Sequence, residues 1–190
     1  MTKYALIFCL IFTSNYSHSQ YNTQTNQRVI VPAFSGIDDA GKPWKSTNVK
    51  SDFLVVYFYP AAMTGGCTKQ ACAYRDLKAS FDKLNVAVIG VSGDEVKNLQ
   101  QFKETYQLNF SLLSDSSGKI AKLFGVPTKN GGSITKEING ENFLFTRGTT
   151  AERWTFILNK KQEIIYKNAQ VNAVNDSQTV KQVIEDYKKK

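Results

Sequence analysis

Apolar residues along the chain follow two patterns. One is a continuous apolar, β-rich run, found at residues 53–59, where Pro60 ends it, and again at residues 86–91. Such runs are typical of strands buried on both faces of a sheet. The other is a recurrence every three or four positions, which predicts amphipathic helices. Two stripes show it: Cys67, Ala71, Tyr74, Leu77, Phe81 and Leu84 in a first helix, and Val96, Leu99, Phe102 and Tyr106 in a second.

Shorter signals predict the remaining elements. Ser92-Gly-Asp-Glu95 is a possible capping box at the start of the second helix. A hairpin is expected within residues 29–44, with its turn at 38–41. The later elements predicted in the same way are a strand near residues 110–113, a short helix near 120–124, strands at 153–158 and 163–167 joined by a turn, and a closing helix with Val180, Val183, Ile184 and Tyr187.

This order of strands and helices indicates one layered α/β domain with a mixed central sheet flanked by helices. The segment between Val126 and Arg153 is long for a connection and contains four glycines. We expect a surface insertion at about residues 127–150, with a small hairpin of its own.

The start of the chain has the features of an export signal. Lys3 and the amino terminus are positively charged, residues 4–12 are apolar, and Ser17 and Ser19 are small residues of the kind that a signal peptidase recognises. The apolar run is well short of the roughly twenty residues that span a bilayer, so we expect no stable membrane insertion; an uncleaved anchor is the alternative. We predict a signal peptide cleaved after Ser19, a mature domain at residues 20–190, and a periplasmic or secreted location.

Composition narrows the possible functions. The 190 residues are 42% hydrophobic and 21% charged, as in globular proteins. The net charge of +8 would suit nucleic acid, but the lysines are scattered along amphipathic elements instead of clustered with aromatic residues, so we expect no nucleic-acid partner. The one histidine, His18, lies in the predicted signal peptide. A mature chain without histidine excludes Ser-His-Asp and Cys-His catalysis and histidine-containing zinc or copper sites.

The candidate chemistry lies around Cys67. This cysteine follows the first buried run and a turn at Gly65 and Gly66, which places it in the first turn of the predicted helix. Unpaired backbone N–H groups and the positive end of the helix dipole favour an anion there, and so favour the thiolate. Thr64 can place its hydroxyl beside the sulfur. A free cysteine is more often a small buried hydrophobe, but the strand–turn–helix position indicates a reactive thiol.

At this motif the sequence resembles the peroxiredoxins. Pro60, Thr64 and Cys67 match their Pro-x-x-x-Thr-x-x-Cys signature after an apolar strand. The surroundings are similar to the bacterioferritin comigratory protein, or Q-type, subfamily, whose Cys-Thr-x-x-Ala-Cys hallmark matches residues 67–72. The likeness covers nearly all of the mature chain. It implies a thioredoxin-like fold and thiol-dependent peroxidase activity.

The resemblance also implies roles for two further residues. Arg153, in an Arg-x-Thr-Phe context, matches the family's arginine, whose planar guanidinium would hold the sulfur ionised and donate to the peroxide oxygens. Arg147 is the alternative, because the insertion could shift the alignment. Pro60 would shield the sulfur from water and from further oxidation. Two departures stand out: Gly65 occupies a position that is commonly proline, and the segment before Arg153 is longer than usual.

The implied reaction needs two cysteines and no cofactor. The Cys67 thiolate attacks hydrogen peroxide or an alkyl hydroperoxide and becomes a sulfenic acid. Cys72 then condenses with it to an intramolecular disulfide, which a thioredoxin-like protein reduces. Five helical residues separate two Cα atoms by about 7.5 Å along the axis and about 140° around it, so the helix has to unwind first. No metal, flavin or haem is implied, and we expect a monomer or a weak dimer.

Three other classes of protein share part of this pattern. A thioredoxin-like thiol-disulfide oxidoreductase would have the same fold, but it needs Cys-x-x-Cys, and four residues separate the cysteines here. A copper-delivery protein of similar fold would add a distal histidine to a cysteine pair, and none remains after processing. A basic binding module would neither consume peroxide nor reduce disulfides. Peroxide consumption with a dithiol reductant separates a peroxidase from all three.

Overall fold

The computed structural model describes residues 29–189, which fold around one seven-stranded sheet. The predicted signal peptide, its cleavage after Ser19 and the single histidine, His18, lie outside the described residues. In the described part of the chain, no helix is both long and apolar enough to cross a membrane.

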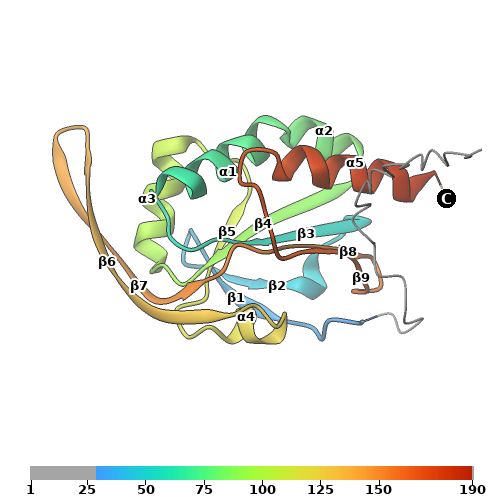
Figure 1. Ribbon diagram of the computed structural model, residues 1–190, viewed down its shortest axis with the longest axis horizontal. Coiled ribbons are helices and arrows are strands. Elements are labelled where there is room, and N and C mark those ends of the chain that lie inside the picture. Colours follow the sequence, from blue (N-terminus) through green and yellow to red (C-terminus); the bar gives the residue numbers. More distant parts are fainter. Residues whose placement is uncertain (1–28, 190) are drawn as a thin grey trace, which may run out of the picture.

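The central sheet is mixed (Figure 1). Its strand order is β2-β1-β5-β4-β3-β8-β9, with parallel pairing in β3–β4 and β4–β5 and antiparallel pairing elsewhere. Its strands are β1 Ser35–Asp38, β2 Pro43–Lys45, β3 Phe53–Phe58, β4 Val86–Ser92, β5 Ser111–Ser114, β8 Thr155–Asn159 and β9 Ile164–Asn168. This arrangement confirms the predicted α/β architecture with a mixed sheet.

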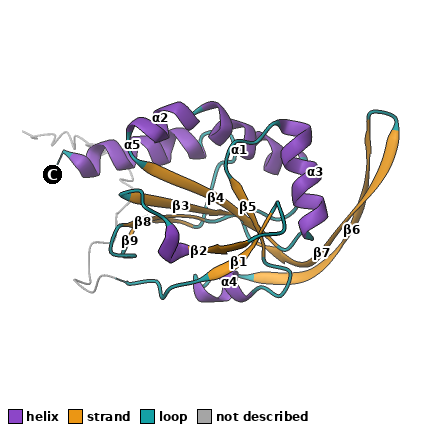
Figure 2. Cartoon of the chain, turned by 180° about the vertical axis from the view of Figure 1, so that it is seen from behind, coloured by secondary structure: helices purple, strands orange, loops and turns teal. Residues whose placement is uncertain are grey.

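Helices cover both faces of the sheet, with α1, α2, α3 and α5 on one face and α4 on the other (Figures 1 and 2). Their bounds are α1 Gly65–Asp76, α2 Lys78–Lys83, α3 Val96–Tyr106, α4 Lys119–Leu123 and α5 Asp176–Lys188, and a short 3₁₀ helix, η1, spans Ser46–Asn48. Alternate residues of β3 enter two core clusters: Phe53, Val55 and Tyr57 enter one, and Leu54, Val56 and Phe58 the other. The strand is therefore buried on both faces, as its unbroken apolar run predicts.

The first predicted helix is in fact two helices. Leu77, at φ −92° and ψ 3°, ends α1 and precedes α2. The apolar stripe continues through this break because Leu77, Phe81 and Leu84 all pack in the same core cluster. Periodicity reports which face of a segment is buried and carries no information on a local break in the helix. The prediction of one continuous helix was therefore wrong.

The predicted capping box before α3 was also wrong. The N-cap of α3 is Glu95, which makes no side-chain cap bond. Ser92 is the last residue of β4, and its hydroxyl donates to Asp94 Oδ2 at 2.8 Å. The same carboxylate oxygen accepts the backbone N–H of Ala62 at 2.8 Å. Residues that resemble a helix cap in sequence thus brace the loop that leads to α1.

The insertion forms a long two-stranded ribbon. Strands β6 Thr128–Ile138 and β7 Glu141–Ala151 pair antiparallel along their whole length. Asn139 and Gly140, both at positive φ, make the tight turn between them. The ribbon extends past α3 and away from the sheet (Figure 1), while backbone hydrogen bonds of Thr146 and Gly148, in the middle of β7, tie it to the loop after β4. The hairpin expected in the insertion is present and occupies nearly all of it.

The other predicted elements are present within a few residues of their expected positions. The early hairpin is β1–β2, the two late strands are β8 and β9, and the closing helix is α5. One shift matters for the site. Because β8 begins at Thr155, Arg153 lies in the connection before the strand instead of in it.

Candidate active site

Cys67 lies at the start of α1, just beyond the end of β3. The chain leaves β3 at Phe58, passes a residue in the left-handed region, Met63 (φ 63°), and enters α1 at Gly65. Cys67 is thus the third residue of the helix, and it is 1% exposed. Backbone N–H groups in this turn have no acceptor within the helix, and the dipole is positive there. The position confirms the predicted strand–turn–helix placement.

One guanidinium lies against the sulfur. Arg153 Nη2 is 3.3 Å from Cys67 Sγ. Gly66 permits this close approach, since a Cβ at that position would lie 3.3 Å from the same nitrogen. Arg147, the alternative from the sequence, lies in β7, where its Nε donates to the Thr150 hydroxyl at 3.0 Å. The structure therefore brings Arg153 to the cysteine and holds Arg147 in the ribbon.

A hydrogen-bonded relay extends from this guanidinium to α5. Arg153 Nη1 donates to Gln70 Oε1 at 2.6 Å, and Gln70 Nε2 donates to Asp176 Oδ2 at 2.8 Å. The same carboxylate oxygen accepts the Tyr74 hydroxyl at 2.7 Å and the Thr155 hydroxyl at 2.8 Å. Gln70 and Tyr74 belong to α1, Thr155 begins β8, and Asp176 begins α5. Three elements that are distant in sequence thus meet at one carboxylate.

Burial dominates the electrostatics of this relay. Asp176 is 2% exposed, and desolvation raises the pKa of its carboxyl, although the hydrogen bonds that it accepts and the charge of Arg153 oppose the shift. Burial likewise raises the pKa of Tyr57 and Tyr74 well above 10, and the negative charges of Cys67 and Asp176 add to the shift at Tyr57. Both tyrosines therefore stay protonated, and Arg153 is the cation beside two acidic groups.

Thr64 shapes the loop before α1. Its hydroxyl donates to the Ala61 carbonyl oxygen at 2.8 Å. The hydroxyl proton is thus engaged by a carbonyl oxygen three residues back, and the place of this hydroxyl beside the sulfur stays a prediction. With the Asp94 bond to Ala62, this bond fixes the path of the chain into the helix.

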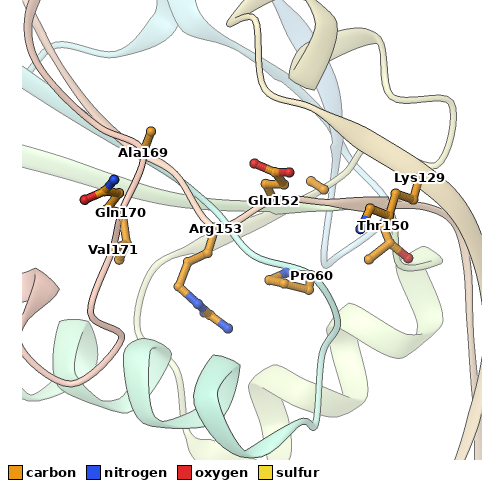
Figure 3. Close-up of a pocket in the computed structure, with 9 residues that line it drawn as sticks. Pro60, Lys129, Thr150, Glu152, Arg153, Ala169, Gln170 and Val171 are labelled. Atoms are coloured by element: carbon orange, nitrogen blue, oxygen red, sulfur yellow. The ribbon is translucent and has the colours of Figure 1, made fainter.

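A cleft of about 410 Å³ opens beside Arg153 (Figure 3). In Figure 3 the Arg153 guanidinium points toward the neighbouring helix, and Pro60 lies between this arginine and Thr150 at the base of the ribbon. The cleft is lined by Pro60, Lys129, Thr150, Ala151, Glu152, Arg153, Ala169, Gln170 and Val171. The structure therefore places two of the predicted site residues, Pro60 and Arg153, in the wall of one cleft.

Cys72 lies farther along α1, half-buried, and both cysteines of the described residues are unpaired. Five helical residues correspond to a rise of about 7.5 Å. Cα atoms joined by a disulfide lie about 4.4–6.8 Å apart, so an intact α1 keeps the two sulfurs from bonding. Across residues 29–189 there is also no cluster of three or more His, Cys, Asp or Glu side chains that could hold a metal ion.

Two residues of the site escaped the sequence reasoning. Gln70 follows Cys67 by three positions, and that spacing places both on one face of a helix, so a local signal was available. Asp176 lies 106 positions from Gln70, and no motif surrounds it. Only the packing of α5 against α1 brings this carboxylate into the site.

The sequence is similar to one family of known proteins. The AhpC/TSA family profile matches residues 28–167. The chloroplastic peroxiredoxin Q of Populus jackii is 40% identical over 147 residues, which cover 76% of this chain and 62% of that protein. The chloroplastic peroxiredoxin Q of Arabidopsis thaliana is 35% identical over 172 residues, which cover 83% of this chain and 72% of that protein. The chain thus spans less than two thirds of the length of the Populus protein.

The fold is similar to that of two solved structures from bacteria. Peroxidoxin BcpB from Mycobacterium tuberculosis superposes with a TM-score of 0.70 at 26% identity, over 84% of this chain and 96% of that chain. Peroxiredoxin Q from Xanthomonas campestris gives a TM-score of 0.66 at 25% identity, over 81% of this chain and 90% of that chain. These similarities confirm the thioredoxin-like fold that the sequence predicts.

Proposed function

Because this chain belongs to the AhpC/TSA family, as a peroxiredoxin of the Q type, we propose that it reduces hydroperoxides with electrons from thiols. The observation that carries this proposal is the 3.3 Å contact between Arg153 Nη2 and Cys67 Sγ in the first turn of α1. A cation and the positive end of a helix both favour the thiolate, and the thiolate is the nucleophilic form of cysteine.

In the first step the Cys67 thiolate attacks the terminal oxygen of a hydroperoxide. The S–O bond forms as the O–O bond breaks, and the leaving hydroxide or alkoxide takes up a proton to give water or an alcohol. Arg153 is in place to donate to the peroxide oxygens as negative charge develops on them. The cysteine becomes a sulfenic acid, and two electrons have passed from sulfur to peroxide.

Cys72 supplies the second thiol. Its sulfur attacks the sulfenic sulfur of Cys67, a water molecule leaves, and an intramolecular disulfide forms. Since an intact α1 separates the two residues, part of this helix opens before the bond closes. A dithiol protein of the thioredoxin type then reduces the disulfide by exchange and restores both thiols.

The cleft supports organic hydroperoxides as substrates beside hydrogen peroxide. Its volume of about 410 Å³ far exceeds the ~30 Å³ that one water molecule takes in the liquid, and hydrogen peroxide is little larger than water. Carbon atoms of Pro60, Ala151, Ala169 and Val171 contribute an apolar wall. Arg153 lines this cleft and also contacts Cys67, so a hydroperoxide bound to Arg153 would have room for an alkyl group along this wall.

Export of the enzyme belongs to the same proposal. The charged start, the short apolar run and the small residues Ser17 and Ser19 support a signal peptide cleaved after Ser19. The mature enzyme would then work in the periplasm or outside the cell. Its thioredoxin-like reductant would have to be located in the same compartment.

Peroxide consumption by residues 20–190 with a dithiol reductant tests the function. Cys67→Ser should abolish consumption, whereas Cys72→Ser should still react once with peroxide and then stop in the absence of a small thiol. The mass of the tryptic peptide that contains both cysteines reports disulfide formation in the wild type. Turnover retained in Cys67→Ser would refute the proposal, and reduction of insulin disulfides without peroxide consumption would identify a thioredoxin-like oxidoreductase instead.

A further inference from the structure

The buried carboxylate of Asp176 has no part in the chemistry above, although it is the end point of the relay from Arg153. We propose that Asp176 is a positioning residue: through Gln70 it fixes the orientation of the Arg153 guanidinium against Cys67. The effect of this residue depends on the proposed peroxidase chemistry, because the orientation of Arg153 matters only if Cys67 reacts with peroxide.

The polarity of the relay follows from its two charged ends. An ionised carboxylate only accepts hydrogen bonds, and a guanidinium only donates them. The Gln70 amide lies between them with one donor end and one acceptor end. Because Asp176 takes the Nε2 end at 2.8 Å, the Oε1 end faces Arg153 Nη1 at 2.6 Å. With Nη1 held there, the planar guanidinium directs Nη2 to the sulfur at 3.3 Å.

The contacts of Asp176 indicate that it serves this relay and not its own helix. Oδ2 accepts all three side-chain bonds, from Gln70, Tyr74 and Thr155, while Oδ1 is buried without a hydrogen-bond partner. Asn175, the N-cap residue of α5, makes no side-chain cap bond either. A buried carboxylate oxygen without a partner is costly. The bonds from α1 and β8 to Oδ2 and the positive charge of Arg153 nearby offset this cost.

The charged and titratable groups that face this carboxylate come from all elements packed around it. Arg153, before β8, is the cation; Tyr74 of α1 donates to the carboxylate; Tyr57 of β3 lies within electrostatic range of both Asp176 and Cys67. The two tyrosines stay neutral because burial raises their pKa. With the tyrosines neutral, Oδ2 of Asp176 is the acceptor that sets the direction of the relay, as the bonds from Gln70, Tyr74 and Thr155 show.

A reciprocal exchange of amide and carboxylate tests this role. Asp176→Asn lets the new amide present either its oxygen or its nitrogen to Gln70, so the orientation of Gln70 is no longer enforced. Gln70→Glu alone places two carboxylates at hydrogen-bond distance in a buried site. The double variant Gln70→Glu/Asp176→Asn restores a single hydrogen-bonding arrangement between positions 176, 70 and 153. The new carboxylate at position 70 accepts from Arg153 and from the amide at position 176.

The measurement is the rate of the first reaction of Cys67 with peroxide, followed by rapid mixing, together with thermal unfolding of each variant. Relative to wild type, Asp176→Asn should slow this step by about fivefold or more, since a charge-assisted hydrogen bond is replaced by a neutral one. Gln70→Glu should also slow it, and the double variant should recover most of the rate. Asp186→Asn, which removes the same charge from an exposed position of α5, is the matched control and should react as wild type does.

Two outcomes would overturn the proposal. One is a rate for Asp176→Asn within about twofold of wild type. The other is a double variant that is as slow as the single variants or is unfolded, because loss of packing would then explain the effect of Asp176→Asn. Failure of the peroxidase function itself would look different, since the wild type would then consume no peroxide at all.

Discussion

Replacing Gly65 by proline should slow closure of the Cys67–Cys72 disulfide and leave the first reaction with peroxide unchanged. Both cysteines lie in α1, where the helical rise between them is about 7.5 Å, and disulfide-bonded Cα atoms lie about 4.4–6.8 Å apart. The disulfide can close only from a state in which part of α1 is open. A change that stabilises the closed helix without contacting the sulfur should therefore lower the population of that state.

Gly65 is suited to such a change. It is the first residue of α1, where the N–H has no intrahelical acceptor and proline is favoured. Thr64 before it has φ −93° and ψ 148°, the extended conformation that a following proline requires, and a Cβ at Gly65 would meet no atom within 4 Å. Proline at a compatible position stabilises by about 0.4–1 kcal/mol, which lowers the opening equilibrium about two- to fivefold. Gly65→Ala should have an effect of the same sign, because it too removes the freedom of glycine in the open state.

Rapid mixing with peroxide, quenching with a thiol-blocking reagent and mass spectrometry of the peptide with both cysteines would give the rate of disulfide closure. The same mixing in a Cys72→Ser background gives the rate of the first step alone. Hydrogen exchange should show greater protection of residues 65–76 in Gly65→Pro. Equal slowing of both steps, or unchanged closure despite greater protection, would refute the opening of α1 as a requirement.

Three further results are expected. Arg153→Lys should slow the first step by about tenfold or more because an ammonium lacks the planar fork, whereas Arg147→Lys should leave it nearly unchanged; the reverse result in rapid mixing would transfer the role to Arg147. Burial raises the pKa of Asp176 above 3.8, so the folded state binds a proton at this carboxyl more tightly than the unfolded state does. The free energy of unfolding of wild type relative to Asp176→Asn should thus be largest below about pH 4 and fall as pH rises through the folded pKa; urea titrations showing a constant or rising difference would contradict this. Amino-terminal sequencing should find a mature protein that begins near Gln20 outside the cytoplasm, and Met1 on a cytoplasmic protein would contradict export.

Much of the fold was predictable because the hydrophobic pattern acts locally. The apolar runs that form β3 and β4 are buried on both faces of the sheet. Because polar residues do not alternate with apolar ones in these runs, the pattern differs clearly from that of a strand with one exposed face. The break at Leu77 was not predictable, because Leu77 and Phe81 keep the same buried face on either side of it. The false capping box has a similar origin, since Ser92 has a better partner in the neighbouring Asp94 than in a helix that begins four residues later.

The site residues, too, were predictable only where the signal that places them is local in the sequence. Pro60 and Cys67 are near neighbours in a strand–turn–helix segment, so their order in the sequence nearly determines their placement. Arg153 was identified through its family context, and the structure places its guanidinium at the sulfur. Asp176 was not found, because its importance lies in contacts with Gln70 and Tyr74, which are more than a hundred positions away. A local sequence pattern cannot identify a carboxylate whose place in the site depends on the packing of α5 against α1.

The relay and the disulfide make opposite demands on α1. Gln70 and Tyr74 lie on either side of Cys72 in the sequence, and both donate to Asp176 only while α1 is closed. Opening the helix breaks both bonds and leaves the buried carboxylate with the Thr155 hydroxyl as its remaining side-chain donor. The contacts that orient Arg153 for the attack of Cys67 on peroxide therefore also delay the arrival of Cys72. A sulfenic acid that is not converted to a disulfide in time is oxidised further and irreversibly. The strength of these bonds therefore sets a balance between a fast reaction of Cys67 with peroxide and a disulfide closure fast enough to prevent that further oxidation. A Gly65-Gly66 pair at the start of the helix shifts that balance toward opening, because glycine gains more freedom on release than any other residue.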